Sequence, residues 1–200
     1  MKKNSFKIIS ILGVAVCLCF GVMLSACASS GGGGPLELTD LSGRTVKLEK
    51  PASRIAALSA SDCEVLCAIG AKDTIIARGT YCDYPADIVT VKDVGSGTLT
   101  STEELLAMKP DIVLMSKTGF TLDQVNAMES AGLKTFVNEA NTFDDTYKYI
   151  ELLAKLTGHE DEGSKVVADM KNSVNDFRDK TKSKEQKTVY FQLCMPEHGY

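Results

Sequence analysis

The sequence predicts an α/β fold: a lobe with a mainly parallel sheet flanked by helices, followed by a long helical segment. Short apolar runs without alternation, such as residues 54–58, are typical of strands that are buried on both faces. Helices of about ten residues with polar capping residues separate these runs, which is the order of a parallel sheet. From residue 142 the apolar positions follow the helical period as far as residue 182.

Strands are expected where short apolar segments lie between turn residues. Residues 35–40 and 46–48 alternate apolar and polar side chains around a Ser-Gly turn, which predicts a hairpin. Further strands are expected at residues 54–58, 74–77, 91–94, 112–115 and 134–137.

Helices are expected where a capping pattern precedes a helical apolar period. Ser61 with Glu64 predicts a capping box for a helix that ends at Gly70. The same spacing predicts two further helices, which start at Ser101 with Glu104 and at Thr121 with Gln124 and end at Pro110 and Gly132.

Residues 142–183 are expected to form one linker helix, interrupted at Gly158-His159. Another apolar strand is expected at residues 188–193, and a single strand cannot form a domain. We therefore expect an N-terminal lobe over residues 35–141, a linker helix over residues 142–183, and only the first strand of a C-terminal lobe in residues 184–200.

The first 27 residues have the pattern of an export signal. Lys2, Lys3 and Lys7 precede an apolar run over residues 8–24. The run closes with Leu-Ser-Ala-Cys at residues 24–27, which resembles the bacterial lipobox, so Cys27 is the expected lipidation site and residues 28–34 a flexible tether. This pattern predicts an exported protein, lipid-anchored on the outer face of the cell membrane. An uncleaved membrane helix is the alternative.

Composition and motifs argue against several classes of function. The net charge is −4, and nucleic-acid binding calls for basic patches, so no nucleic-acid partner is expected. The chain has no Gly-x-Ser-x-Gly, P-loop or Gly-x-Gly-x-x-Gly motif, so we expect no enzyme and no cofactor. Its two histidines, His159 and His198, are few for a zinc or manganese site, and no metal ligands are assigned.

Four cysteines lie beyond Cys27. Cys63 and Cys67 are four residues apart on a predicted helix, and apolar burial is the preferred interpretation because a disulfide at that spacing needs awkward geometry. With Cys82 and Cys194 they form no Cys-x-x-Cys pair, which argues against a thioredoxin-like site or a zinc knuckle.

Several short stretches occur in a fairly specific order. They are Asp-Leu-Ser-Gly-Arg at residues 40–44 with Pro51 and Arg54-Ile55, Ala-Ile-Gly-Ala at 68–71, Thr-Tyr-Cys-Asp-Tyr-Pro at 80–85, and residues 103–115 around Lys-Pro-Asp-Ile-Val. This order resembles the class III substrate-binding proteins, which carry cobalamin, haem and iron–siderophore complexes to ABC permeases. The resemblance covers residues 36 to 193. It implies two α/β lobes joined by one rigid helix, with the ligand in the cleft between them.

Ligands of such sheets bind outside the carboxyl ends of the strands, so the loops there are the candidate site. Tyr81 is favoured, because an aromatic face with a polar tip suits a flat macrocycle or a catecholate; an aromatic packed under the loop is the alternative. The expected ligand-binding residues are Ser59, Ala60, Ser61, Tyr81, Cys82, Asp83, Gly97, Thr98 and Lys117.

The resemblance leaves the ligand open among an iron complex, haem and a corrinoid. The stretch around Tyr81 is similar to the loop of cobalamin-binding members, but those stack a tryptophan on the ligand and this chain has none. Haem would call for axial ligands such as Tyr81, Met195 or His198, and a siderophore for basic residues such as Arg78 and Lys117. The alternative function is a zinc or manganese carrier of the related helix-linked family.

The resemblance also implies a second partner. A surface glutamate on each lobe pairs with arginines of the ABC permease, which works with its ATPase, and Glu103 stands at the matching position of the first lobe. The other interpretation of Glu103 is that it stabilises the N-terminus of its own helix.

Overall fold

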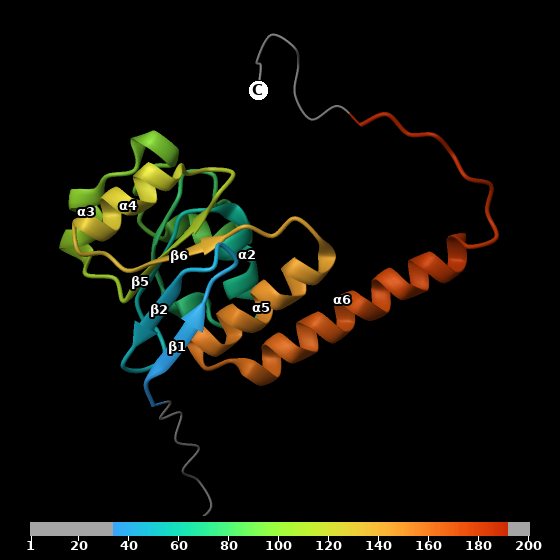
Figure 1. Ribbon diagram of the computed structural model, residues 1–200, viewed down its shortest axis with the longest axis horizontal. Helices are drawn as coiled ribbons and strands as arrows, with labels where there is room; N and C mark the ends of the chain where they lie inside the picture. Colours follow the sequence, from blue (N-terminus) through green and yellow to red (C-terminus); the bar gives the residue numbers. More distant parts are fainter. Residues whose placement is uncertain (1–33, 192–200) are drawn as a thin grey trace, which may run out of the picture. The chain divides into compact units, whose positions relative to one another are not determined.

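Four parallel strands form the central sheet of the computed structural model, which describes residues 34–191 (Figure 1). In spatial order they are β4 (Ile75–Arg78), β3 (Ile55–Ala57), β5 (Ile112–Ser116) and β6 (Thr135–Asn138). Every pairing in this sheet is parallel. The expected α/β fold with a parallel sheet is therefore confirmed.

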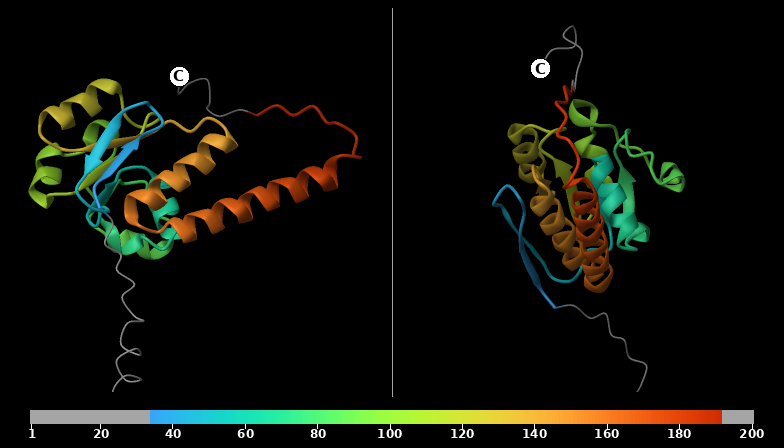
Figure 2. Two further views of the ribbon diagram at one scale, coloured as in Figure 1. Left: turned by 60° about the horizontal axis from the view of Figure 1, so that its bottom comes forward. Right: turned by 90° about the vertical axis from the view of Figure 1, so that its right-hand side faces the viewer.

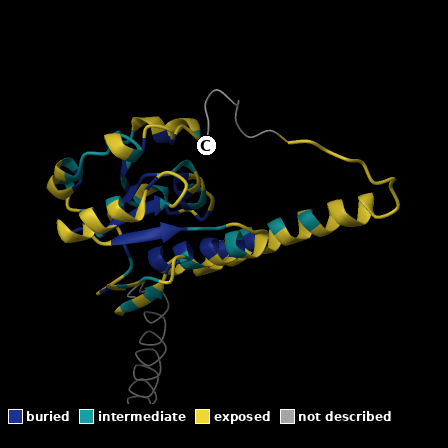
Figure 3. Cartoon of the chain, turned by 45° about the horizontal axis from the view of Figure 1, so that its top comes forward, coloured by how far each residue is buried: buried dark blue, intermediate teal, exposed yellow. Residues whose placement is uncertain are grey.

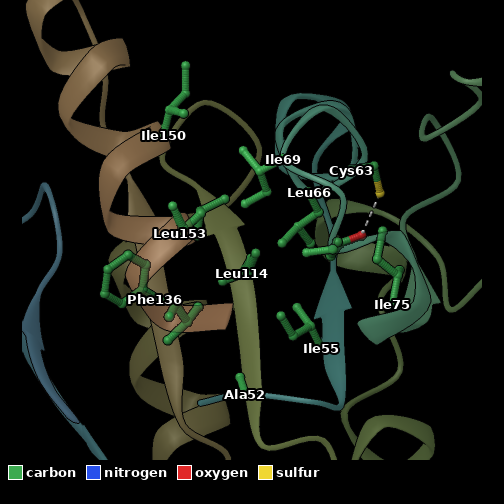
Figure 4. Close-up of a cluster of buried hydrophobic side chains, with 14 of the residues drawn as sticks. Ala52, Ile55, Cys63, Leu66, Ile69, Ile75, Leu114, Phe136, Ile150 and Leu153 are labelled. Atoms are coloured by element: carbon green, nitrogen blue, oxygen red, sulfur yellow. Dashed lines mark hydrogen bonds between the residues drawn. The ribbon is translucent and has the colours of Figure 1, made fainter. Parts of the chain in front are cut away.

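Helices cover both faces of this sheet, because successive side chains of a strand point to opposite sides (Figure 2). Ile55 and Ala57 of β3 pack against α2 (Ala60–Ala68) and α5 (Phe143–Thr157). Ala56, between them, belongs to the second core, with α3 (Thr102–Met108) and α4 (Leu122–Ser130). Residues of the first core are drawn in Figure 4.

An antiparallel hairpin precedes the sheet, as the alternation predicts: β1 (Leu36–Thr39) pairs with β2 (Thr45–Leu48). The buried carboxylate of Asp40 holds its turn by accepting hydrogen bonds from the backbone N–H groups of Ser42 and Arg44, at 3.0 and 2.8 Å. Its second oxygen accepts from the N–H of Val137 at 2.9 Å. Asp40 therefore attaches the hairpin to β6.

The capping predictions are confirmed in part. Thr121 and Gln124 form a capping box at α4, and the Ser101 hydroxyl caps α3. The prediction at Ser61 is wrong: α2 begins one residue after Ser59, whose hydroxyl accepts from the N–H of Asp62. Ser61 lies inside the first helical turn, where its hydroxyl contacts that of Ser59 at 3.1 Å.

The strand expected at residues 91–94 is also wrong. The segment makes one isolated parallel bridge, between Arg78 and Asp93. Short 3-10 turns flank it: η2 (Ala86–Thr90) and η3 (Gly97–Leu99), and a third, η1 (Lys72–Thr74), precedes β4. Two valines around a charged pair are apolar enough to suggest a strand but too few to pair along one.

The single helix expected over residues 142–183 is instead two. Thr142 caps α5, and Gly158 ends it with a φ of 76°, a left-handed conformation that glycine adopts without strain. The chain then turns into α6 (Glu160–Thr181), which packs along α5 and continues beyond it (Figure 1). Since Tyr149 and Leu153 are buried against the sheet, α5 is part of the lobe's core.

The second half of α6 is exposed (Figure 3). Residues 182–191 form no strand, so the strand expected at residues 188–193 is not found in its described part. A strand needs a hydrogen-bonded neighbour, and these residues, all exposed, have none in the described structure.

Other predictions concern residues that the structure does not describe. The export signal, Cys27 and residues 28–33 of the tether lie outside the described residues, as do Cys194, Met195 and His198. Within residues 34–191, no helix is both long and apolar enough to cross a membrane.

Candidate functional site

Two adjoining hollows lie beside the loops that follow the strands of the sheet. The first, the polar hollow, has a volume of about 520 Å³. Its lining is rich in hydroxyl, amide and carboxylate groups, among them Ser61, Ser116, Thr118, Asn138, Glu139 and Asn141. The carboxyl end of a parallel sheet is where ligands of such folds bind, so the polar hollow is a candidate site.

The second hollow, the tyrosine hollow, has a volume of about 360 Å³ and is more apolar. Tyr81, which is 77% exposed, lines this hollow, and so does Leu99, which is 83% exposed and lies in the loop after Val94. Ser116 and Thr118 line both hollows. The two hollows therefore form one continuous face, which we call the strand-end face.

The loops of this face are held together by backbone contacts. A Cβ atom on Gly79 would lie 2.4 Å from the backbone oxygen of Leu58, so only glycine allows the loop after β4 to approach β3 so closely. The N–H of Thr80 donates to the Ser96 hydroxyl at 2.8 Å, and the Thr80 hydroxyl donates to Asp93 at 3.1 Å. These contacts fix the backbone of the loop that carries Tyr81.

The two basic residues suggested for an anionic ligand already have partners. The Arg78 guanidinium donates to the backbone oxygens of Val91, Gly79 and Thr80 and pairs with Asp93. The Lys117 ammonium pairs with Glu139, and this hydrogen bond lowers the pKa of the Glu139 carboxyl. The positive charge at this face is therefore largely compensated.

The structure brings most of the expected ligand-binding residues together. The tyrosine hollow is lined by Ser59, Ala60, Tyr81, Gly97 and Thr98, and the polar hollow by Ser61 and Lys117. Cys82 is placed differently: it is 1% exposed and packs in the core beneath the loop. Asp83 is exposed beside Tyr81 but lines neither hollow. Glu103 is exposed in the first turn of α3.

Sequence reasoning missed the side of the polar hollow that β6 and α5 form. Asn138, Glu139 and Asn141 follow the last strand, and Thr146 and Tyr149 come from α5. The signal was present, since the rule that selected the other strand-end loops applies equally to the loop after β6.

A buried acid lies beneath the polar hollow. Asp62 is fully buried in α2, and its Oδ1 accepts a hydrogen bond of 2.8 Å from the Tyr149 hydroxyl. Its Oδ2 has no hydrogen-bond partner. Burial raises the pKa of Asp62 to about 6, against the opposing effect of the nearby polar side chains of Ser59, Tyr149 and Asn138.

Within residues 34–191, no three His, Cys, Asp or Glu side chains are grouped so that they could hold a metal ion. The face offers hydroxyl, amide and aromatic groups to a ligand instead.

This fold is that of the periplasmic binding proteins. Residues 55–199 match the family model described as periplasmic binding protein, and the chain belongs to this family. Similar proteins include the ABC transporter substrate-binding lipoprotein YvrC of Bacillus subtilis, with 28% identity over 80% of this chain and 52% of YvrC. The vitamin B12-binding protein of Yersinia pestis is 26% identical over 71% of this chain and 51% of its own length.

A solved structure agrees on the fold. The periplasmic vitamin B12-binding protein BtuF of Vibrio cholerae matches with a TM-score of 0.63 and 24% identity, over 68% of this chain and 53% of BtuF. The chain thus spans about half the length of the relatives it matches.

Proposed function

We propose that this protein is the ligand-capturing component of an ABC importer and that its strand-end face holds a corrinoid or an iron complex for delivery to the permease. The observation that carries the proposal is the continuous face of two hollows, with an exposed tyrosine in one and hydroxyl and amide groups in the other. An aromatic surface beside hydrogen-bonding groups suits a large, flat ligand with a polar periphery.

The charge of the face favours a neutral ligand among the three candidates. Of the described residues that line the two hollows, only Lys117 is cationic, and Glu139 compensates it. A catecholate siderophore and the propionates of haem are anionic and call for free arginine or lysine side chains. A cobalamin-type corrinoid carries neutral amides, which hydroxyl and amide groups such as those of Ser116 and Asn138 can bind. The similarity to the vitamin B12-binding protein of Yersinia pestis supports this choice.

We further propose that the face forms one side of a cleft, with a second lobe opposite it, as the resemblance implies. Glu103 is proposed as a docking residue for the permease, which its exposure on the first turn of α3 supports. Lipid attachment at Cys27 is proposed to keep the exported protein at the outer face of the cell membrane.

Ligand titration tests the proposal. Purified protein is titrated with cyanocobalamin, haemin, a ferric catecholate siderophore and zinc, and binding is followed by calorimetry. We expect saturable binding of the corrinoid. Tyr81→Ala should weaken it about tenfold, because it removes one aromatic contact worth roughly 1.4 kcal/mol.

Tyr84 provides the matched control. It lies on the same loop and is 68% exposed, but it lines neither hollow. Tyr84→Ala should therefore bind the corrinoid as the native protein does. Equal losses in both variants would contradict the role of Tyr81, and saturation by zinc alone would replace the proposal with a free-metal carrier.

A transport assay tests the docking residue separately. Glu103→Ala should keep its ligand affinity but lower ligand uptake in cells that carry the permease. Glu160, an acid in the first turn of α6, is the control, and Glu160→Ala should leave uptake unchanged. Native uptake by Glu103→Ala would remove the docking role.

A further inference from the structure

Two cysteines from distant parts of the sequence meet beneath the tyrosine hollow. Cys63 lies in the first half of α2 and Cys82 in the loop after β4, and their exposures are 0% and 1%. The sulfur of Cys63 lies 3.7 Å from the backbone oxygen of Ala57, and that of Cys82 lies 3.6 Å from the same oxygen. Figure 4 shows the Cys63 sulfur pointing at this backbone oxygen.

Three donors point to the backbone oxygen of Ala57, which is more than this oxygen can accept with good geometry. Its oxygen already accepts a hydrogen bond of 2.9 Å from the N–H of Gly79. A carbonyl oxygen has two lone pairs, so one of the two thiols is left with a poor partner. The two S–H groups therefore make only weak hydrogen bonds in the core, whereas a disulfide has no hydrogen to donate.

The two thiols also interact with each other. A hydrogen bond with Cys82, then burial, raises the pKa of the Cys63 thiol. The same hydrogen bond lowers the pKa of Cys82, against the effect of burial.

We propose that Cys63 and Cys82 form a disulfide that attaches the loop carrying Tyr81 to α2. The oxidant is a small disulfide such as oxidised glutathione, and the exchange occurs while the chain folds, before both thiols are buried. The Cys82 thiolate attacks one glutathione sulfur, which breaks the glutathione S–S bond and releases one glutathione thiolate. The Cys63 thiolate then attacks the Cys82 sulfur and releases the second. The two protein thiols lose two electrons and two protons, and one oxidised glutathione becomes two reduced ones.

The bond would stabilise the ligand face directly. Tyr81 is the neighbour of Cys82, and Ser59 and Ala60, which line the same hollow, begin the helix that carries Cys63. A disulfide between these elements closes a loop of about 20 residues and restricts the separation of the two sides of the tyrosine hollow.

Peptide mapping tests the proposal without any ligand. The full chain is unfolded, refolded in a buffer of oxidised and reduced glutathione, alkylated in denaturant without reductant, and digested with trypsin. Cleavage after Arg54, Lys72, Arg78 and Lys92 places Cys63 and Cys67 in one peptide, residues 55–72, and Cys82 in another, residues 79–92. We expect these two peptides to be joined, and fragmentation to show Cys67 alkylated.

Cys67 is the internal control, because it lies one helical turn after Cys63 and is partly exposed. Alkylation of both Cys63 and Cys82, or a bond from either one to Cys67, would overturn the proposal. Reduction of the joined form should lower its Tm by roughly 10 °C. The mapping uses the native sequence, so a folding defect in a serine variant cannot obscure the result.

Discussion

The buried carboxyl of Asp62 predicts an unusual dependence of stability on pH. Its pKa is raised from 3.8 to about 6 in the folded protein, so the folded protein holds this proton more tightly than the unfolded chain does. The contribution of Asp62 to stability is therefore greatest at pH values below 3.8. It falls as the pH rises towards about 6 and then levels off.

The magnitude follows from these two pKa values. Between pH 5 and pH 7.5, the difference in proton binding lowers the free energy of unfolding by about 1.4 kcal/mol. Other acids act in the opposite direction: the hydrogen bond from Thr142 lowers the pKa of Asp145, whose contribution is lost as the pH falls. The measurement must therefore compare a variant with the native protein at each pH.

Asp62→Asn is the appropriate variant, because its side-chain oxygen can still accept from the Tyr149 hydroxyl and the group does not titrate. Urea unfolding is followed by circular dichroism at pH 5 and pH 7.5. Relative to the native protein, Asp62→Asn should gain about 1.4 kcal/mol between these two pH values. Asp169→Asn, an exposed change on α6, is the control and should show no such gain. If Asp62→Asn changed the free energy of unfolding by the same amount at pH 5 and pH 7.5, the reasoning would be refuted.

Three further predictions concern folding and the positioning of the face. Asp40→Ala removes the acceptor of three backbone N–H groups, so the free energy of unfolding, measured with urea, should fall by about 3 kcal/mol. No measurable fall would mean that water replaces the carboxylate. Gly79→Ala places a Cβ atom 2.4 Å from a backbone oxygen and should lower both Tm and ligand affinity. Gly34→Ala is the control, because its Cβ atom would lie in open space, and it should change neither quantity. Native ligand affinity in Gly79→Ala would contradict the close approach of the two backbones. Leu153→Ala leaves a cavity between α5 and the sheet and should lower the free energy of unfolding by about 3 kcal/mol, and a loss below about 1 kcal/mol would mean that the core repacks.

Local signals in the sequence were sufficient for most of the sheet and helices. The apolar runs that become β3, β5 and β6 are buried on both faces, and such runs do not depend on distant residues to be recognised. Helix starts were predicted correctly at Ser101 and Thr121, where a hydroxyl residue precedes an acid or an amide by three positions. At α2 two serines compete, and packing of the helix against the sheet selects Ser59.

Other features depend on tertiary contacts. The helical period of residues 143–181 does not show whether the helix is free or packed. Tyr149 is buried because α5 packs against the sheet, and the chain reverses only after it, at Gly158. In the loop after β4, neighbouring residues point in opposite directions, so Tyr81 faces the hollow while Cys82 faces the core. Their adjacent positions in the sequence do not show which of the two side chains faces the core. The meeting of Cys63 with Cys82 likewise requires the sheet order, in which β4 lies beside β3.

The crossing of α5 and α6 has a mechanical consequence. A Cβ atom on Gly163 would lie 2.4 Å from the Cβ of Ala154, so the two backbones meet there almost without intervening side chains. No side chain separates the two helices at this point, so the contact fixes the distance between α5 and α6 there. Because Thr146 and Tyr149 of α5 line the polar hollow, α5 connects this fixed contact with the hollow.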